Sequence, residues 1–290
     1  MITLKGLGVA LITPFKSNKE IDFYSLEKLL GYIKNDVDYL IVFGTTSEAP
    51  TIKKEEKNEI LSLIKSKTSL PIVLGIGGYN TEQIVNDIKK QDFDGISAIL
   101  SVTPYYNKPN QKGLLEHYTL IADNCPVPVV LYNVPPRTSV NLETETVIKL
   151  SHHKNIVAIK EASGNFKQIM DIIRNKPQDF SVVSGDDGIT LPLISIGVIG
   201  LISVIANAYP KLTKKLVRKA LEGDYETAKK LHYRLLPAID AIFKEGNPSG
   251  IKALLSVKGI IKNNLRLPLV SVSNELMAEM ENIDKEIFDK

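Results

Sequence analysis

The feature that most constrains the fold is a regular alternation along the chain of short, β-branched apolar runs with amphipathic segments of helical period. The runs that predict strands are Gly8–Thr13, Tyr39–Phe43, Pro71–Gly75, Gly95–Val102, Val127–Tyr132, Ile156–Ile159, Phe180–Ser184 and Val198–Val204. The segments that predict helices between them include Ser25–Lys34, Lys54–Lys65, Thr81–Lys90, Lys112–Asp123, Glu143–Ser151 and Phe166–Asn175. Eight strand–helix units with buried strands predict an α/β fold, a (β/α)8 barrel of the TIM type, rather than an open doubly wound sheet.

The alternation stops after residue 224. Three helical patterns follow with no strand between them, at Tyr225–Phe243, Ser249–Lys262 and Ser273–Phe288. We therefore expect a catalytic barrel over residues 1–224 and a C-terminal helical domain over residues 225–290.

Composition narrows the class of protein. Hydrophobic residues make up 43% and charged residues 24% of the 290 residues, as is usual for globular proteins. The 36 basic and 33 acidic residues are mixed along the chain, which indicates neither a nucleic-acid partner nor a membrane partner but suits a small anionic substrate. The single Cys125 excludes an internal disulfide and cysteine-ligated zinc. The longest apolar stretch, Ile189–Ala208, is broken by Pro and Gly, which predicts a helix, a turn and a buried strand rather than a membrane span. We therefore expect a cytoplasmic protein.

A lysine ends the sixth predicted strand. Lys160 follows Ile156–Ile159 and precedes small residues and a glycine. In a barrel of parallel strands the loops after each strand converge at one end, where the chemistry takes place. A lysine in this place is either a solvated rim residue, which is the ordinary case, or a desolvated nucleophile.

Other strand ends carry polar groups too. The second strand is followed by Gly44-Thr45-Thr46-Ser47-Glu48, which suits equally a cradle for a carboxylate and a simple helix cap. The fourth is followed by Tyr105 and Tyr106 between two prolines, a pattern that ordinarily indicates interface packing.

The fifth and seventh strands end in groups of different character. Tyr132 closes the fifth strand and offers a proton carrier, while Arg137 follows a rigid Pro-Pro and can hold a carboxylate bidentately. Asp186 and Asp187 follow the seventh strand, where a helix cap is favoured over a metal site because no histidine joins them. With Lys160 at the centre and no metal cluster, the pattern favours Schiff-base chemistry on a keto group.

These motifs resemble those of the dihydrodipicolinate synthase and N-acetylneuraminate lyase superfamily of class I aldolases. The resemblance rests on Gly44-Thr45-Thr46, Tyr105-Tyr106-Asn107-Lys108-Pro109, Tyr132–Thr138, Ile159–Gly164 and Ser184–Asp187, which occur in the expected order over almost the whole chain. The segment Asn247–Lys252 fits as well. Thr45-Thr46 and Arg137 are similar to the synthase branch, and Ser47 stands where a glycine is usual.

The resemblance implies a lyase of the lysine and diaminopimelate biosynthesis pathway that condenses pyruvate with L-aspartate 4-semialdehyde. It implies that Lys160 forms the imine with pyruvate without any cofactor or metal, and that Tyr132 carries protons. Thr46 would link Tyr132 to Tyr106 of a neighbouring subunit. The implied substrate-binding residues are Thr45 and Thr46 for the pyruvate carboxylate, Arg137 for the semialdehyde carboxylate, and Gly185 and Ile202 through their backbones.

The implied relay requires a homo-oligomer, and we expect a tetramer built from tight dimers. Many members of the superfamily are inhibited by lysine at a subunit interface. The comparable positions here are Ala49, Pro50, Lys54, Lys57, Tyr79 and Gln83, which lack the acid and add positive charge. Because like charges repel a cationic effector, we expect weak or absent inhibition by lysine.

Two other functions are compatible with the same residues. A lyase or aldolase for sialic acid or a 2-keto-3-deoxy sugar acid would use the same Lys160 and Tyr132, and only the contacts to the second substrate would differ. A catalytically inactive barrel that senses a keto acid is a different class of function, against which the intact set of Lys160, Tyr132 and Arg137 argues.

Overall fold

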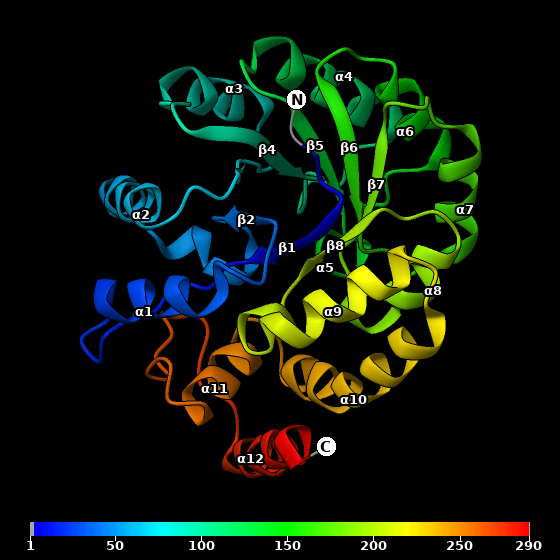
Figure 1. Ribbon diagram of the computed structural model, residues 1–290. Coiled ribbons are helices and arrows are strands. Elements are labelled where there is room, and N and C mark those ends of the chain that lie inside the picture. The colour runs from blue at the N-terminus through cyan, green and yellow to red at the C-terminus, as the bar shows by residue number, and fades with distance from the viewer. Residues whose placement is uncertain (1–2, 290) are drawn as a thin grey trace. The chain divides into compact units, whose positions relative to one another are not determined.

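The computed structural model describes residues 3–289 and contains a closed barrel of parallel strands in the order β1 to β8 (Figure 1). The predicted (β/α)8 fold is thereby confirmed. As predicted, only helices follow the last barrel strand in the described part of the sequence. Residues 1, 2 and 290, which the predicted domain limits include, lie outside the described residues. The predicted division at residue 224 stays a prediction.

The described chain forms two compact units. Of the described residues, the first unit comprises 3–5 and Pro71–Ile202. Its elements are β3 (Ile72–Gly75), α3 (Thr81–Lys90), β4 (Ile96–Val102), α4 (Gln111–Asn124), β5 (Val129–Asn133), α5 (Pro135–Thr138), α6 (Thr144–Ser151), β6 (Ile156–Glu161), α7 (Phe166–Asn175), β7 (Ser181–Ser184), a 3-10 turn (Asp187–Ile189), α8 (Thr190–Ser195) and β8 (Gly200–Ser203), whose last residue belongs to the second unit. The stretch Ile189–Ala208 thus holds a helix, a turn and a buried strand, as predicted.

The core of the first unit lies between its strands and the helices that flank them in Figure 1. Apolar side chains on the outward faces of the strands pack against helical ones, and they include Ile99, Leu131, Ile159 and Val182 from strands and Leu114, Tyr118, Val147 and Ile169 from helices. Because neighbouring residues in a strand point to opposite faces, this packing decides which residues face the barrel interior.

Of the described residues, the second unit comprises Gly6–Leu70 and 203–289. Its elements are β1 (Gly6–Ala10), α1 (Phe23–Ile33), β2 (Tyr39–Val42), 3-10 turns at Thr45–Ser47, Ala49–Thr51 and Ile205–Asn207, α2 (Lys54–Lys67), α9 (Pro210–Leu221), α10 (Tyr225–Lys244), α11 (Ser249–Val257) and α12 (Asn274–Asp289). Helices α10, α11 and α12 pack on one another.

Asp and Asn side chains fix where several helices begin. The side chains of Asp22, Asn80, Asn110, Asn165 and Asp224 each accept a hydrogen bond from a backbone N–H three residues further on. Such a cap satisfies one of the otherwise unpaired N–H groups of a first helical turn. Helices α3 and α7 accordingly have the bounds that the sequence predicts.

One predicted helix is too long. The pattern Ser249–Lys262 predicted a single helix, but α11 ends at Val257. The N–H of Lys258 donates to Leu254 O, and Gly259 adopts a left-handed conformation with φ of 66°. A glycine in this conformation ends a helix, which hydrophobic periodicity alone does not reveal.

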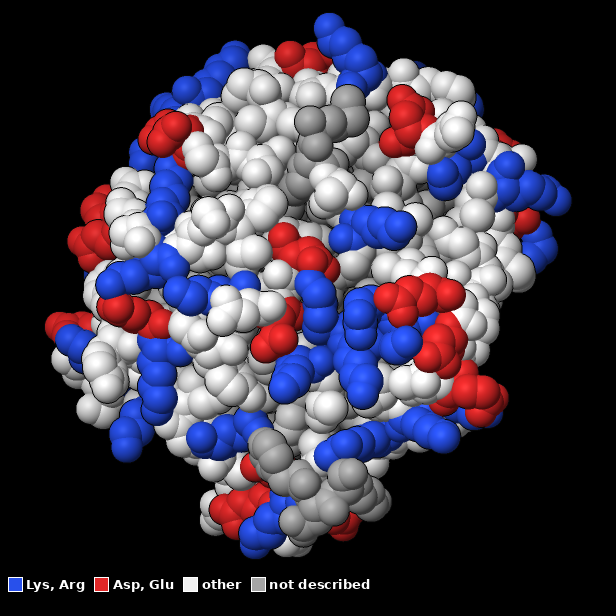
Figure 2. All heavy atoms as spheres, viewed as in Figure 1, with Lys and Arg blue, Asp and Glu red and all other residues white. Residues whose placement is uncertain are grey.

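The surface carries both signs of charge. Figure 2 shows Lys and Arg side chains gathered over α9, with acidic side chains beside them. Several are paired there, since Lys219 lies 3.2 Å from Glu222 and 3.1 Å from Asp224. Among the described helices, none combines the length and the apolar character that crossing a membrane requires.

The close crossing of α10 and α11 yields a stability prediction. A Cβ added at Gly250 would lie 2.1 Å from the backbone oxygen of Ile242, and a backbone cannot yield as a flexible side chain can. We expect Gly250→Ala to lower the free energy of unfolding by about 1–3 kcal/mol or more. Urea denaturation measures this change.

The matched control is Gly31→Ala in the exposed part of α1, where an added Cβ meets nothing within 4 Å. There the substitution should raise the free energy of unfolding by about 0.5–1 kcal/mol, because alanine favours the helix. Equal effects of the two substitutions would contradict the packing argument.

Candidate active site

Lys160 lies at the end of β6 beside Tyr132 of β5. The two residues are register partners in the parallel pair, and the Lys160 Nζ lies 4.2 Å from the centroid of the Tyr132 ring. Lys160 is 6% exposed and Tyr132 is 7% exposed. The ordinary interpretation of Lys160 as a solvated rim residue is therefore wrong. Strand β6 also runs two residues beyond the predicted Ile159, so that Lys160 is held by a ladder of backbone hydrogen bonds.

Gly185 leaves room for the Lys160 side chain. A Cβ at position 185 would lie 2.7 Å from Lys160 Cε and 2.9 Å from Ala162 Cβ. The Gly185 N–H donates to Glu161 O at 2.8 Å, which holds the turn after β7 against β6. A glycine is thus required where the aliphatic part of Lys160 passes. Ile202, the other residue expected to line the pocket through its backbone, is buried in β8.

A buried carboxylate lies on the opposite face of β6. Glu161 is fully buried and accepts hydrogen bonds from Asn133 Nδ2 at 3.2 Å to both oxygens, from Ser163 N at 2.9 Å and from Gln168 Nε2 at 3.2 Å. Asn133 Oδ1 accepts from Leu142 N at 2.9 Å, which orients the amide. Burial raises the pKa of the Glu161 carboxyl, and these hydrogen bonds oppose the shift.

The Glu161 group was missed in the sequence analysis. Its members, Asn133, Glu161 and Gln168, come from two strands and a helix. In the sequence analysis, Asn133 and Glu161 appear only within longer motifs and Gln168 only within a predicted helix. A signal was present, however. In the pattern of β6, a charged residue that follows Lys160 directly must point to the helix-covered face, where a carboxylate needs donors.

Arg137 lies on the short helix α5 directly after β5 and is exposed. The two prolines of the motif occupy the first positions of this helix, where a missing N–H costs nothing, and Ser139 ends it in a left-handed conformation. Thr138 anchors the helix, because its hydroxyl oxygen accepts from Thr103 Oγ1 at 3.2 Å and the hydroxyl donates to Val140 O at 3.0 Å. The guanidinium is therefore carried by a fixed backbone.

The two threonines belong to the second unit, after β2. Residues Thr45–Ser47 form a 3-10 turn whose N-cap residue is Gly44, which has no side chain. The interpretation of the threonines as a simple helix cap is therefore wrong. Thr46 is buried and Thr45 is exposed. Ser47, which replaces the usual glycine, donates its hydroxyl to Gly44 O at 2.7 Å and closes the turn.

The tyrosine pair presents aromatic rings to the surface. Tyr106 is 88% exposed and has a left-handed backbone with φ of 69°. The Tyr79 ring lies 5.3 Å from that of Tyr105 and 6.4 Å from that of Tyr106, measured between centroids. Asn107 Nδ2 donates to Tyr79 O at 3.0 Å and ties the two loops together. An exposed aromatic group of this kind suits an interface.

The acidic pair after β7 acts as predicted. Asp186 caps the 3-10 turn, since its side chain accepts from Gly188 N at 2.9 Å. Within residues 3–289, no three His, Cys, Asp or Glu side chains come together as metal ligands would.

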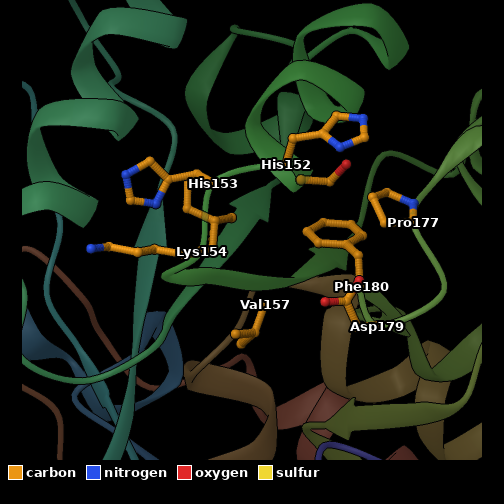
Figure 3. A pocket seen from close by; sticks show the side chains of 9 residues that line it. His152, His153, Lys154, Val157, Pro177, Asp179 and Phe180 are labelled. Atoms are coloured by element: carbon orange, nitrogen blue, oxygen red, sulfur yellow. The ribbon is translucent and has the colours of Figure 1, made fainter.

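A separate pocket lies at the other end of β6, near the start of β7. It is lined by Ser151, His152, His153, Lys154, Ile156, Val157, Pro177, Asp179 and Phe180. Figure 3 shows the imidazoles of His152 and His153 pointing in different directions, and His153 Nε2 lies 3.0 Å from Asp123 Oδ1. These histidines do not converge on one point, and the pocket is distinct from the surroundings of Lys160.

Comparison with known proteins identifies the family. The sequence pattern of the Dihydrodipicolinate synthetase family matches residues 3–287. The chain belongs to this family. A 4-hydroxy-tetrahydrodipicolinate synthase of Parabacteroides distasonis is 50% identical over 273 residues, which are 93% of this chain and 92% of that protein.

Solved structures of the dihydrodipicolinate synthetase family agree closely in fold. One is a chloride-inhibited dihydrodipicolinate synthase from Acinetobacter baumannii complexed with pyruvate, with a TM-score of 0.95, 35% identity and coverage of 99% of both chains. Another is described as the first monomeric dihydrodipicolinate synthase variant, with a TM-score of 0.93, 38% identity and coverage of 98% of this chain and 97% of that one. Because these relatives carry the synthase name, the sugar-acid lyase alternative is not favoured.

The buried Glu161 yields a prediction on pH. Its folded pKa lies above the ordinary 4.5, so the folded protein binds a proton where the unfolded chain has lost it. The wild type should therefore lose stability as pH rises from 4.5 through the folded pKa, by up to about 1.4 kcal/mol per pH unit. The variant Glu161→Gln lacks the carboxyl group that titrates and should not show this loss of stability.

Urea denaturation of both proteins from about pH 4.5 to about pH 8 measures the difference between them. The free energy of unfolding of the wild type minus that of the variant should fall as pH rises. The control Glu143→Gln makes the same change at an exposed carboxylate that makes no cap hydrogen bond, and the slope with pH should be steeper for Glu161→Gln than for this control. Equal slopes for the two variants would contradict the prediction.

Proposed function

We propose that this chain is a lyase that condenses pyruvate with L-aspartate 4-semialdehyde to 4-hydroxy-tetrahydrodipicolinate, through a Schiff base on Lys160. The observation that carries the proposal is the buried Lys160 amine, 4.2 Å from the ring of Tyr132. An amine held out of water beside a phenol has both the nucleophile and the proton carrier that imine formation needs. Membership of the family and its 50% identical synthase relative support the choice of substrates.

In the first half of the reaction, Lys160 attacks the keto carbon of pyruvate and water leaves, which gives an iminium. The iminium draws electrons from the pyruvate methyl group, so that the methyl loses a proton to give an enamine. Tyr132 carries this proton. Thr45 holds the pyruvate carboxylate with its hydroxyl and N–H groups, Thr46 holds it through its N–H group, and the backbones of Gly185 and Ile202 line the pocket.

In the second half, the enamine carbon attacks the aldehyde carbon of the semialdehyde, whose carboxylate Arg137 holds. The substrate's own amine then attacks the iminium carbon. This attack closes the ring and displaces the Lys160 amine, which is free for a new cycle. Lys160 itself supplies the electron sink, and the proposed mechanism therefore uses neither a metal nor an organic cofactor.

The proposed relay extends across a subunit interface. Thr46 links Tyr132 to Tyr106 of the partner subunit, and the exposed position of the Tyr106 ring supports this role. The proposal therefore includes a homo-oligomer, expected to be a tetramer of tight dimers, although one solved relative is described as a monomeric variant. The cytoplasmic location and the weak response to lysine stay predictions.

Borohydride reduction tests the Schiff base. Incubation of the protein with pyruvate and borohydride should add one reduced pyruvate unit to Lys160, located by peptide mass spectrometry. The variant Lys160→Met should take up none, whereas Lys154→Met, which removes an exposed lysine near the start of β6, should react as the wild type does. A wild-type protein without an adduct on Lys160 would refute the proposed mechanism.

Arg137→Ala tests the second substrate. Loss of a charge-assisted carboxylate contact should lower kcat/KM for the semialdehyde by about 10- to 100-fold. The yield of the pyruvate adduct should not change, since that step precedes the aldehyde. Arg174→Ala, on the exposed side of α7, is the control for loss of an arginine. An unchanged kcat/KM in Arg137→Ala would exclude the assigned role.

A further inference from the structure

The Thr46 side chain has a partner from a distant part of the second unit. Asn247 lies between α10 and α11, and its Nδ2 donates to Thr46 Oγ1 at 3.0 Å, although the two residues are 201 positions apart in sequence. Thr46 is 3% exposed and Asn247 is 7% exposed. The contact is therefore shielded from bulk water, which would otherwise compete for the hydroxyl.

A threonine hydroxyl has one proton to donate and two lone pairs that accept. When the Asn247 amide donates into the Thr46 oxygen, the Thr46 proton must point to a different acceptor. The contact thus restricts the directions in which Thr46 can donate, because it occupies one lone pair and excludes the proton from that side. A hydroxyl that relays protons between two phenols needs such a fixed direction, because a freely rotating one is misaligned for much of the time.

The turn that carries Thr46 is held at a second point. Glu48, in a left-handed conformation with φ of 57°, accepts from Lys252 Nζ and from the Arg266 N–H at 3.0 Å. Lys252 also donates to Asn264 O at 2.9 Å and lies 4.1 Å from the ring centroid of Phe15. The side chains of Lys252 and Glu48 are fully buried.

The Lys252 side chain keeps its charge at neutral pH. Burial lowers the pKa of Lys252 to about 8, and the Glu48 carboxylate opposes the shift. Removing either partner would leave an uncompensated buried charge, so the pair holds the backbone of the turn in one place. With the backbone fixed, the direction of the Thr46 hydroxyl depends on the Asn247 amide.

We propose that Asn247 is a positioning residue that orients the Thr46 hydroxyl for proton transfer, a role that rests on the function proposed above. It acts through the Thr46 hydroxyl and is assigned no direct contact with the substrate. The connection between α10 and α11 thereby takes part in the reaction of the barrel, through one hydrogen bond to the turn after β2.

The test uses the full-length chain with Asn247→Ala and Asn247→Asp. Both should form the pyruvate adduct on Lys160 to the wild-type extent and keep KM for pyruvate within about twofold, while kcat falls by about 10- to 100-fold. The rate at which the pyruvate methyl protons exchange with D2O, followed by NMR, should fall in parallel. In Asn247→Asp the new carboxylate can only accept a hydrogen bond, so it draws the Thr46 proton towards itself. Its kcat should therefore fall at least as much as that of Asn247→Ala.

The matched control is Ser249→Ala, two residues after Asn247, which removes a part-buried hydrogen bond to Val270 O and leaves the bond to Thr46 in place. It should cost comparable stability and leave kcat unchanged. The double variant Asn247→Ala with Thr46→Val should be no slower than Thr46→Val alone, because both changes act on one hydroxyl.

The outcomes separate the two proposals. A wild-type protein without a pyruvate adduct refutes the proposed function and this role with it. If the adduct is normal, three results would refute the role of Asn247 and leave the proposed function standing. These are an unchanged kcat in both Asn247 variants, an equal loss of kcat in Ser249→Ala, and additive losses of kcat in the double variant. Should Asn247→Ala fail to fold, the nearly isosteric Asn247→Asp decides the question by itself.

Discussion

The parallel pairing of β5 with β6 is the constraint on which the chemistry of the first unit depends. Its register places Tyr132 beside Lys160 and, one residue on, Asn133 beside Glu161. Because side chains alternate between the faces of a strand, one step of register serves two purposes. The phenol and the amine meet on one face, and the amide and the carboxylate bind the strands together on the other. A slip of one residue would exchange the faces and lose both arrangements.

The sequence predicts the residues of this site better than their partners. Lys160 and Tyr132 stand out because each ends a buried strand, and strand ends are local patterns. The bond from Asn247 to Thr46 joins residues 201 positions apart, and no local pattern encodes such a contact. Lys252 is an intermediate case: a single lysine within the apolar run Gly250–Leu255 signals a buried charge, but the sequence does not name Glu48 as its partner.

The errors in element bounds have the same origin. The end of α11 at Val257 depends on the left-handed Gly259, and the extension of β6 to Glu161 depends on pairing with β5 and β7. Hydrophobic periodicity describes the face that an element buries, not the residue at which its backbone hydrogen bonds stop. The barrel as a whole was predictable because eight repeated units outweigh such errors at single ends.

Stability alone does not account for the Lys252–Glu48 pair. Moving two charges out of water offsets most of their attraction, and a well-packed apolar pair often serves a core equally well. An apolar pair, however, cannot accept the hydrogen bond from the Arg266 N–H, and it cannot hold a non-glycine residue in the left-handed conformation seen at Glu48. The pair fixes the path of the backbone between Thr46 and α2. The two charges are therefore better explained by the position of the turn than by the strength of the fold.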